Sequence, residues 1–113
     1  MREIKFRAWD KEEQKMLDWD KFFNLDIAQV FESKGSWGVY PMQYTGLKDK
    51  NGVEFFEGDI GWDDHQEVHG QVIFENGAFK YEWENISEDL FEATDDIEIV
   101  GNIHENPELL EGN

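Results

Sequence analysis

At 113 residues, of which 15% are aromatic, the chain is long enough for one domain and has the large side chains that a hydrophobic core needs. It contains no cysteine, which excludes disulfide bonds and thiolate-based metal or redox sites. Its formal net charge of −17 disfavours direct binding to nucleic acids and to anionic membranes, because both are bound largely through Lys and Arg.

The N-terminal segment predicts a β-hairpin. Apolar and charged residues alternate over residues 4–8, which is typical of a half-buried strand. Residues 10–14 form a polar turn, and residues 15–17 return as a short strand. This start does not resemble a secretory signal, and no apolar run in the chain has the length of a membrane span. We therefore expect a cytoplasmic protein.

A short helix is predicted over residues 18–31, because Phe23, Ile27 and Val30 follow helical spacing. From Trp37 onward the pattern is that of β-structure. Strands are predicted over residues 39–44, 53–56, 60–62, 71–74, 78–83 and 97–100.

Turn signals separate these strands. Asn51-Gly52 and Asn76-Gly77 tolerate the positive φ of tight hairpins. Pro41 confines its strand to a sheet edge or a bulge. Helical turns are predicted over residues 87–91 and 106–110. Short strands with turns about every ten residues predict a mainly β fold, either a small barrel or a sandwich.

One domain over residues 1–113 is expected. The region around residues 33–38 is the candidate boundary between two sub-lobes, residues 1–36 and residues 37–113.

The acidic charge is concentrated in the second half of the chain. Residues 1–50 carry nine basic and nine acidic side chains, whereas residues 51–113 carry eighteen acidic side chains and a single basic one, Lys80. Such a surface favours a partner with a basic surface and steers their encounter. The alternative reading is that the acidity serves solubility alone.

The segment from Asp63 to His69 is the only part of the sequence that resembles a metal site. In an extended segment His65 and His69 lie about 13 Å apart, which is too far for one ion, so a solvated loop is the favoured interpretation. Pairs of carboxylates such as Glu82 and Glu84 carry no sign of the burial that acid–base catalysis requires. No catalytic residue, metal site or cofactor site is therefore predicted.

Five tryptophans exceed what a core of this size normally takes, so some are expected at the surface, where aromatic side chains anchor interfaces. Trp19 and Trp37 are two candidates. The residues expected to contact a partner are two further tryptophans and a set of carboxylates: Trp62, Trp83, Asp63, Asp64, Glu67, Glu82, Glu84, Glu88, Asp89, Asp95 and Asp96.

Four segments together resemble the YopX family of bacteriophages and prophages. They are MREIKFRAWD at residues 1–10, MQYTGLKDKNG at 42–52, EGDI at 57–60 and VGNIHENPELL at 100–110. The chain departs from the family pattern at Gly61, where an apolar residue is usual, and at His104, where an aromatic residue is common. The resemblance implies a mainly β fold with a small SH3-like β-barrel, an N-terminal hairpin and one or two short helices, encoded on a mobile element. It carries over no catalytic residue.

Residues and resemblance together predict a non-enzymatic accessory protein of a phage or prophage. It is expected to act in the cytoplasm of the bacterial host cell by binding a basic protein surface or by self-association. The alternative is an acidic mimic of nucleic acid that inhibits a host nucleic-acid-binding or defence protein. Neither a cofactor, nor direct contact with nucleic acid, nor a membrane is expected in either case.

Overall fold

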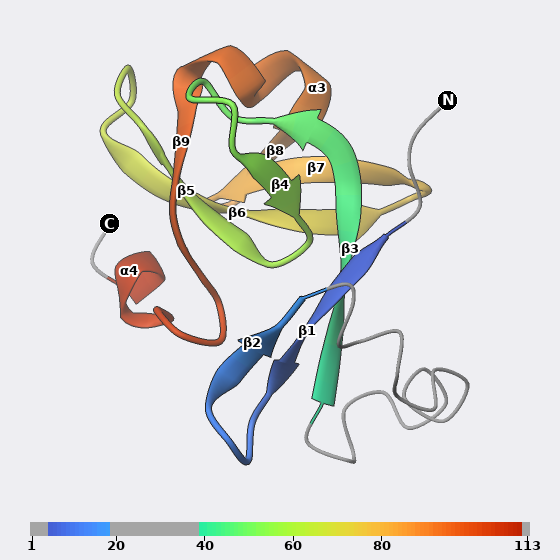
Figure 1. Cartoon of the computed structure of the whole chain (residues 1–113). Helices are drawn as coiled ribbons and strands as arrows, with labels where there is room; N and C mark the ends of the chain where they lie inside the picture. Colours follow the sequence, from blue (N-terminus) through green and yellow to red (C-terminus); the bar gives the residue numbers. More distant parts are fainter. Residues whose placement is uncertain (1–4, 19–38, 112–113) are drawn as a thin grey trace. The chain divides into compact units, whose positions relative to one another are not determined.

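The computed structural model describes residues 5–18 and 39–111, and this part of the chain is mainly β (Figure 1). The strands are β1 (Phe6–Asp10), β2 (Lys15–Leu17), β3 (Val39–Lys48), β4 (Glu54–Phe56), β5 (Asp59–Asp63), β6 (Val68–Glu75), β7 (Ala78–Trp83), β8 (Ile86–Asp89) and β9 (Ile97–Asn102). The helices are α3 (Leu90–Ala93), the 3-10 turn η1 (Thr94–Asp96) and α4 (Glu108–Glu111). The chain divides into two compact units, Met1–Tyr44 and Thr45–Asn113.

The N-terminal unit contains the predicted hairpin. Strand β1 pairs antiparallel with β2 on one side and with β3 on the other, so that Ala8 lies opposite both Leu17 and Pro41. The hairpin loop is held by Asp10, whose carboxylate accepts the backbone amides of Glu12 and Glu13 at 3.0 and 3.1 Å. The helix predicted over residues 18–31 and the boundary predicted at 33–38 fall in the segment 19–38, outside the described residues.

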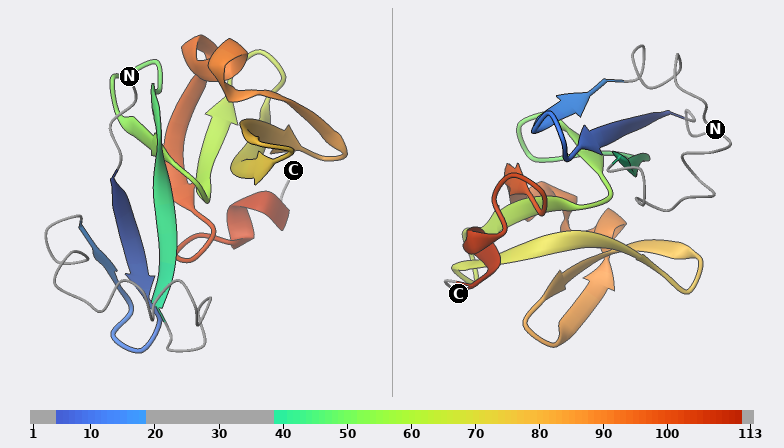
Figure 2. Two further views of the ribbon diagram at one scale, coloured as in Figure 1. Left: turned by 90° about the vertical axis from the view of Figure 1, so that its right-hand side faces the viewer. Right: turned by 90° about the horizontal axis from the view of Figure 1, so that it is seen from below.

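The C-terminal unit is built on a five-stranded antiparallel sheet with the order β8-β7-β6-β5-β9. The sheet curls into a half-barrel of the SH3-like kind, as the two further views show (Figure 2). Helix α3 and η1 connect β8 to β9, and α4 packs against β6. The core of this unit consists of Phe55, Val72, Tyr81, Trp83, Leu90, Ala93 and Ile97.

Two glycines make room for Tyr81, the largest of the fully buried side chains. Gly61 on β5 lies directly opposite Gly70 on β6. A Cβ on Gly70 would lie 2.6 Å from the ring of Tyr81, and a Cβ on Gly61 would collide with Cγ2 of Ile97. The ring of Tyr81 therefore packs directly against the backbone of Gly61 and Gly70, which carry no side chains.

The predicted turns are present, in two different forms. Asn76 and Gly77 have φ values of 54° and 81° and join β6 to β7 with a two-residue loop, as predicted. At Asn51-Gly52 only Gly52 has a positive φ, of 84°. There the backbone amide of Asp49 donates to the carbonyl of Val53 at 2.8 Å, so the loop is longer than a two-residue hairpin turn.

One local prediction is wrong. The helical turn expected over residues 87–91 begins later, at Leu90, because residues up to Asp89 pair with β7 as strand β8. Asp89 makes no capping hydrogen bond with its side chain. Gly101 lies within β9, where a Cβ would approach Oδ1 of Asn106 to 2.5 Å. This close approach requires glycine there.

Among the helices that the structure describes, none is both long and apolar enough to cross a bilayer.

Substituting Tyr81 with phenylalanine is expected to leave stability at neutral pH within about 1 kcal/mol of the wild type. The hydroxyl is buried, and no acceptor among the described residues takes its proton. Burial raises the pKa of Tyr81 above its ordinary value, and the charge of Asp63 adds to this effect. The folded state therefore keeps the proton that the unfolded chain releases near pH 10.

It follows that the free energy of unfolding of the wild type falls with rising pH above about pH 10 faster than that of Tyr81→Phe. Urea unfolding of both proteins at pH 8 and above pH 10 measures the difference, and the comparison cancels the titration of lysines. If the free energy of unfolding fell equally with pH for the two proteins, the raised pKa of the Tyr81 hydroxyl would be contradicted.

Candidate binding surface

Not all carboxylates of the C-terminal unit belong to its surface, because three are buried and organise loops. Asp49 accepts the amides of Asn51 and Val53 through Oδ1, at 2.8 and 2.9 Å. Asp59 accepts the amide of Phe56 at 2.7 Å. These side chains serve as hydrogen-bond acceptors for backbone groups that would otherwise lack a partner.

Asp63, one of the residues expected to contact a partner, belongs to this buried group. Its side chain is 6% exposed, and Oδ1 accepts the amides of His65 and Gln66 at 2.8 and 3.3 Å. Asp63 therefore closes the loop between β5 and β6. The neighbouring Glu67 has a φ of 55° in the same loop and is exposed.

Asp64 lies on the surface beside one of the few cations of this unit. Its Oδ2 lies 2.6 Å from Nζ of Lys50, and its Oδ1 accepts the indole N–H of Trp62 at 2.7 Å. The hydrogen bond from Lys50, followed by the one from Trp62, lowers the pKa of the Asp64 carboxyl group. Asp64 and the half-buried Trp62 thus form one cluster, and both are among the residues expected to contact a partner.

A second acidic cluster gathers around the loop between β5 and β6. Oδ1 of Asp96 lies 3.2 Å from Nε2 of His65. Partial burial raises the pKa of Glu88, and the charges of Glu92, Asp63 and Asp96 raise it further. These carboxylates are therefore close enough to repel one another. No group of three metal-ligating side chains occurs within residues 5–18 and 39–111.

The remaining predicted carboxylates are spread over other parts of the unit. Asp89 on β8 pairs with Lys80 on β7 at 3.1 Å, and Asp95 is exposed in η1. Glu82 and Glu84 line a pocket on the β6–β7 hairpin. The predicted residues therefore do not form a single cluster.

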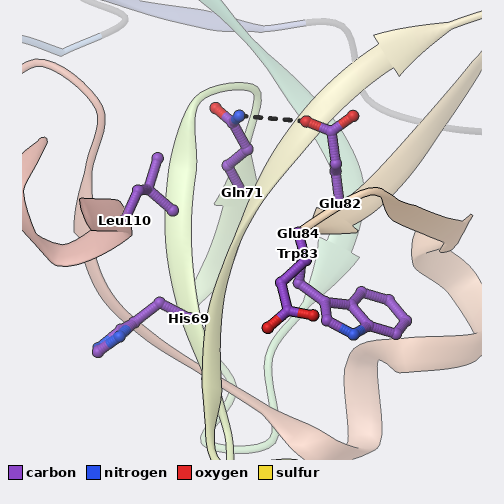
Figure 3. A pocket seen from close by; sticks show the side chains of 6 residues that line it. All are labelled: His69, Gln71, Glu82, Trp83, Glu84 and Leu110. Carbon is purple, nitrogen blue, oxygen red and sulfur yellow. Dashed lines mark hydrogen bonds between the residues drawn. The ribbon is translucent and has the colours of Figure 1, made fainter. Parts of the chain in front are cut away.

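The pocket has a volume of about 190 Å³ (Figure 3). Its lining comes from β6, from β7 and the turn that follows it, and from α4: His69, Gln71, Glu82, Trp83, Glu84 and Leu110. Nε2 of Gln71 donates to Oε1 of Glu82 at 3.3 Å, which ties the two strands together across the pocket wall. The ring of His69 packs against Trp62 with 4.8 Å between centroids. The wall thus combines two carboxylates with aromatic and aliphatic side chains.

Gln71 and Leu110 were not predicted as site residues. The position of Gln71 could have been predicted from the sequence. The Asn76-Gly77 turn fixes the register of the β6–β7 hairpin, and this register places Gln71 opposite Glu82. For Leu110 no local signal exists, since its place depends on how α4 packs against β6.

The two described tryptophans of the predicted interface differ in their surroundings. Trp62 is half-buried, with its indole N–H bound to Asp64. Trp83 is 7% exposed and belongs to the core, where its indole lies beside the ring of Tyr81 with 6.0 Å between centroids. Trp19 and Trp37 lie outside the described residues.

Comparisons with known proteins identify the family. A search of curated proteins gave no match. The chain is similar to the crystal structure of protein EF1440 from Enterococcus faecalis, with 30% identity, a TM-score of 0.72, and coverage of 97% of this chain and 99% of that one. It is also similar in fold to the protein yopX from Bacillus subtilis, with 20% identity, a TM-score of 0.61, and coverage of 100% and 99%. The model of the family described as YopX protein matches residues 5–111. The chain therefore belongs to the YopX family.

Proposed function

We propose that the protein is a non-enzymatic accessory protein of a phage or prophage that binds the basic surface of a partner protein through the C-terminal unit. One observation carries this proposal: the exposed charge of that unit is almost entirely negative. Its exposed carboxylates among the described residues are Asp64, Glu67, Glu75, Glu84, Asp89, Glu92, Asp95, Asp96, Glu105, Glu108 and Glu111.

The cations of this unit do little to offset the carboxylates. Its basic side chains are Lys48, Lys50 and Lys80. Two of them are already engaged, Lys50 with Asp64 and Lys80 with Asp89. The remaining field attracts a basic surface and repels a second copy of the same unit. A basic partner is for this reason favoured over self-association.

The nucleic-acid mimic is the special case in which the basic surface of the partner is its own nucleic-acid channel. In that case duplex DNA must compete with this protein for the partner. If duplex DNA displaces this protein from the partner, the mimic is favoured. If it does not, the protein binds at another basic surface.

Binding to a partner captured from a bacterial lysate on the immobilised full chain is expected to weaken by on the order of tenfold between about 50 and about 300 mM NaCl. The double variant Glu92→Gln/Asp95→Asn is expected to weaken it at low salt with an unchanged melting temperature, because both side chains are exposed. Calorimetric titration at several salt concentrations measures both effects.

The matched control is Glu12→Gln/Glu13→Gln, which removes the same charge from the N-terminal unit. These two side chains are also exposed, and the surface ion pair between Glu13 and Lys15 contributes little to stability. Binding that is independent of salt, or equally weakened by both double variants, would contradict the proposal.

A further inference from the structure

We propose that the pocket formed by β6, β7 and α4 binds the guanidinium group of an arginine side chain on the basic partner. This inference rests on the proposed function and specifies one contact within it. The pocket offers a carboxylate at two places, Glu82 on β7 and Glu84 in the turn that follows, and both line the same hollow (Figure 3).

Hydrogen-bond acceptors dominate the polar part of the pocket wall. Glu82 uses Oε1 to accept the amide N–H of Gln71, which leaves its second carboxylate oxygen and the carbonyl oxygen of the Gln71 amide as further acceptors. Glu84 is exposed and adds another carboxylate. A ligand that satisfies such a wall must supply several N–H donors and a positive charge.

The rest of the wall is apolar and suits the stem of a long side chain. Leu110 lines the pocket, and His69 is backed by the ring of Trp62. Side chains of Arg bury their methylene groups against such surfaces while the charged head keeps its hydrogen bonds. The pocket therefore combines the two kinds of contact that an arginine makes.

The volume of the pocket suits a small chemical group. It is about 190 Å³, whereas pockets for drug-sized ligands or cofactors usually have volumes of roughly 300–1,000 Å³. A single side-chain head group fits this space.

Arginine fits the arrangement better than lysine because of its geometry. A guanidinium group is planar, presents five donors in a fixed fork, and stacks against aromatic and amide planes. The acceptors here are spread over two strands and a turn, and the wall contains planar groups in His69 and Gln71. An ammonium group is a compact charge that gains less from such a spread of acceptors.

The test titrates the full-length chain at pH 8 with N-acetyl-arginine amide, its neutral isostere N-acetyl-citrulline amide, and N-acetyl-lysine amide. Proton–nitrogen NMR spectra report the site through the side-chain amide of Gln71 and the backbone amide of Glu84. We expect arginine to shift these signals and to bind several-fold more tightly than both other probes. Equal binding of citrulline or lysine, or shifts confined to the neighbourhood of Asp64 and Asp96, would overturn the inference.

Glu84→Gln is expected to weaken binding of the arginine probe about three- to fivefold, because it removes one charge without changing the size of the side chain. Glu82→Gln, the second variant, is expected to weaken it similarly. The matched control is Glu75→Gln, an exposed carboxylate of the same hairpin that does not line the pocket. An equal effect of Glu75→Gln and Glu84→Gln would overturn the inference.

The two proposals fail in different ways. A captured partner whose binding remains salt-sensitive while the arginine probe misses the pocket overturns the pocket assignment alone. A partner whose binding does not depend on salt overturns the proposed function, whatever the arginine probe does.

Discussion

Replacing Gly61 with alanine is expected to lower the free energy of unfolding by roughly 2–4 kcal/mol. The new Cβ would collide with Cγ2 of Ile97 and would lie 3.1 Å from the ring of Tyr81. Both neighbours have 0% exposure, so neither can move toward solvent. The methyl group would therefore displace the β5 backbone from the core or drive core side chains from their preferred rotamers.

A double-mutant cycle separates this clash from the general effect of losing a glycine. Ile97→Ala removes the colliding Cγ2 and by itself costs about 2–5 kcal/mol through the cavity that it leaves. The double variant Gly61→Ala/Ile97→Ala is expected to cost less than the sum of the two single variants, because the new methyl group occupies part of that cavity. Urea unfolding monitored by tryptophan fluorescence gives all four free energies.

The matched glycine control is Gly77→Ala, where a Cβ would meet nothing within 4 Å. Its φ of 81° means that it suffers backbone strain alone, of about 1 kcal/mol. Additive effects of Gly61→Ala and Ile97→Ala, or a cost at Gly61 no larger than at Gly77, would contradict the packing account.

The parts of the fold that the sequence predicted well are those set by local chemistry. The limits of β2 and β7 match the predicted strands, since a polar turn precedes the first and Asn76-Gly77 fixes the start of the second. The start of α3 was missed for the opposite reason. The residues before Leu90 have a helix-capping pattern, but pairing with β7 across the sheet outweighs that local preference.

Contacts between distant residues were beyond what the sequence could show. Gly61 and Gly70 are nine residues apart along the chain, and nothing local indicates that both face the ring of Tyr81. Likewise, Asp63 was predicted to lie at the surface, although its carboxylate accepts backbone amides of its own loop. A carboxylate next to a turn can be a surface charge or a loop acceptor, and the count of charges does not distinguish the two.

Replacing Asp49 with alanine is expected to destabilise the C-terminal unit by about 3–5 kcal/mol, more than any substitution of an exposed carboxylate. The side chain is 6% exposed, and it accepts three backbone amides. Oδ1 binds those of Asn51 and Val53, and Oδ2 binds that of Ile99 on β9 at 2.9 Å. Alanine leaves these donors without an acceptor and frees the β3–β4 loop from the edge strand β9.

Asp49→Asn provides a sharper test, because it keeps the size of the side chain. One amide oxygen can still accept two backbone N–H groups, but the NH₂ group then faces a third donor, so an intermediate loss of stability is expected. Faster hydrogen exchange at the Ile99 amide should accompany it. Lys48→Ala, an exposed neighbour, is the control and is expected to stay within about 0.5 kcal/mol of the wild type. An Asp49→Ala variant as stable as Lys48→Ala would contradict the role of this carboxylate.

The stability of the Asp49 variants also decides which carboxylates can be used to test the proposed function. Asp59 and Asp63 resemble Asp49 in accepting backbone amides while buried. Neutralising such residues weakens the fold and thereby lowers binding for reasons unrelated to the electric field of the protein. Because the exposed carboxylates can be changed without this cost, a loss of partner binding that follows their removal at constant melting temperature is attributable to the field itself.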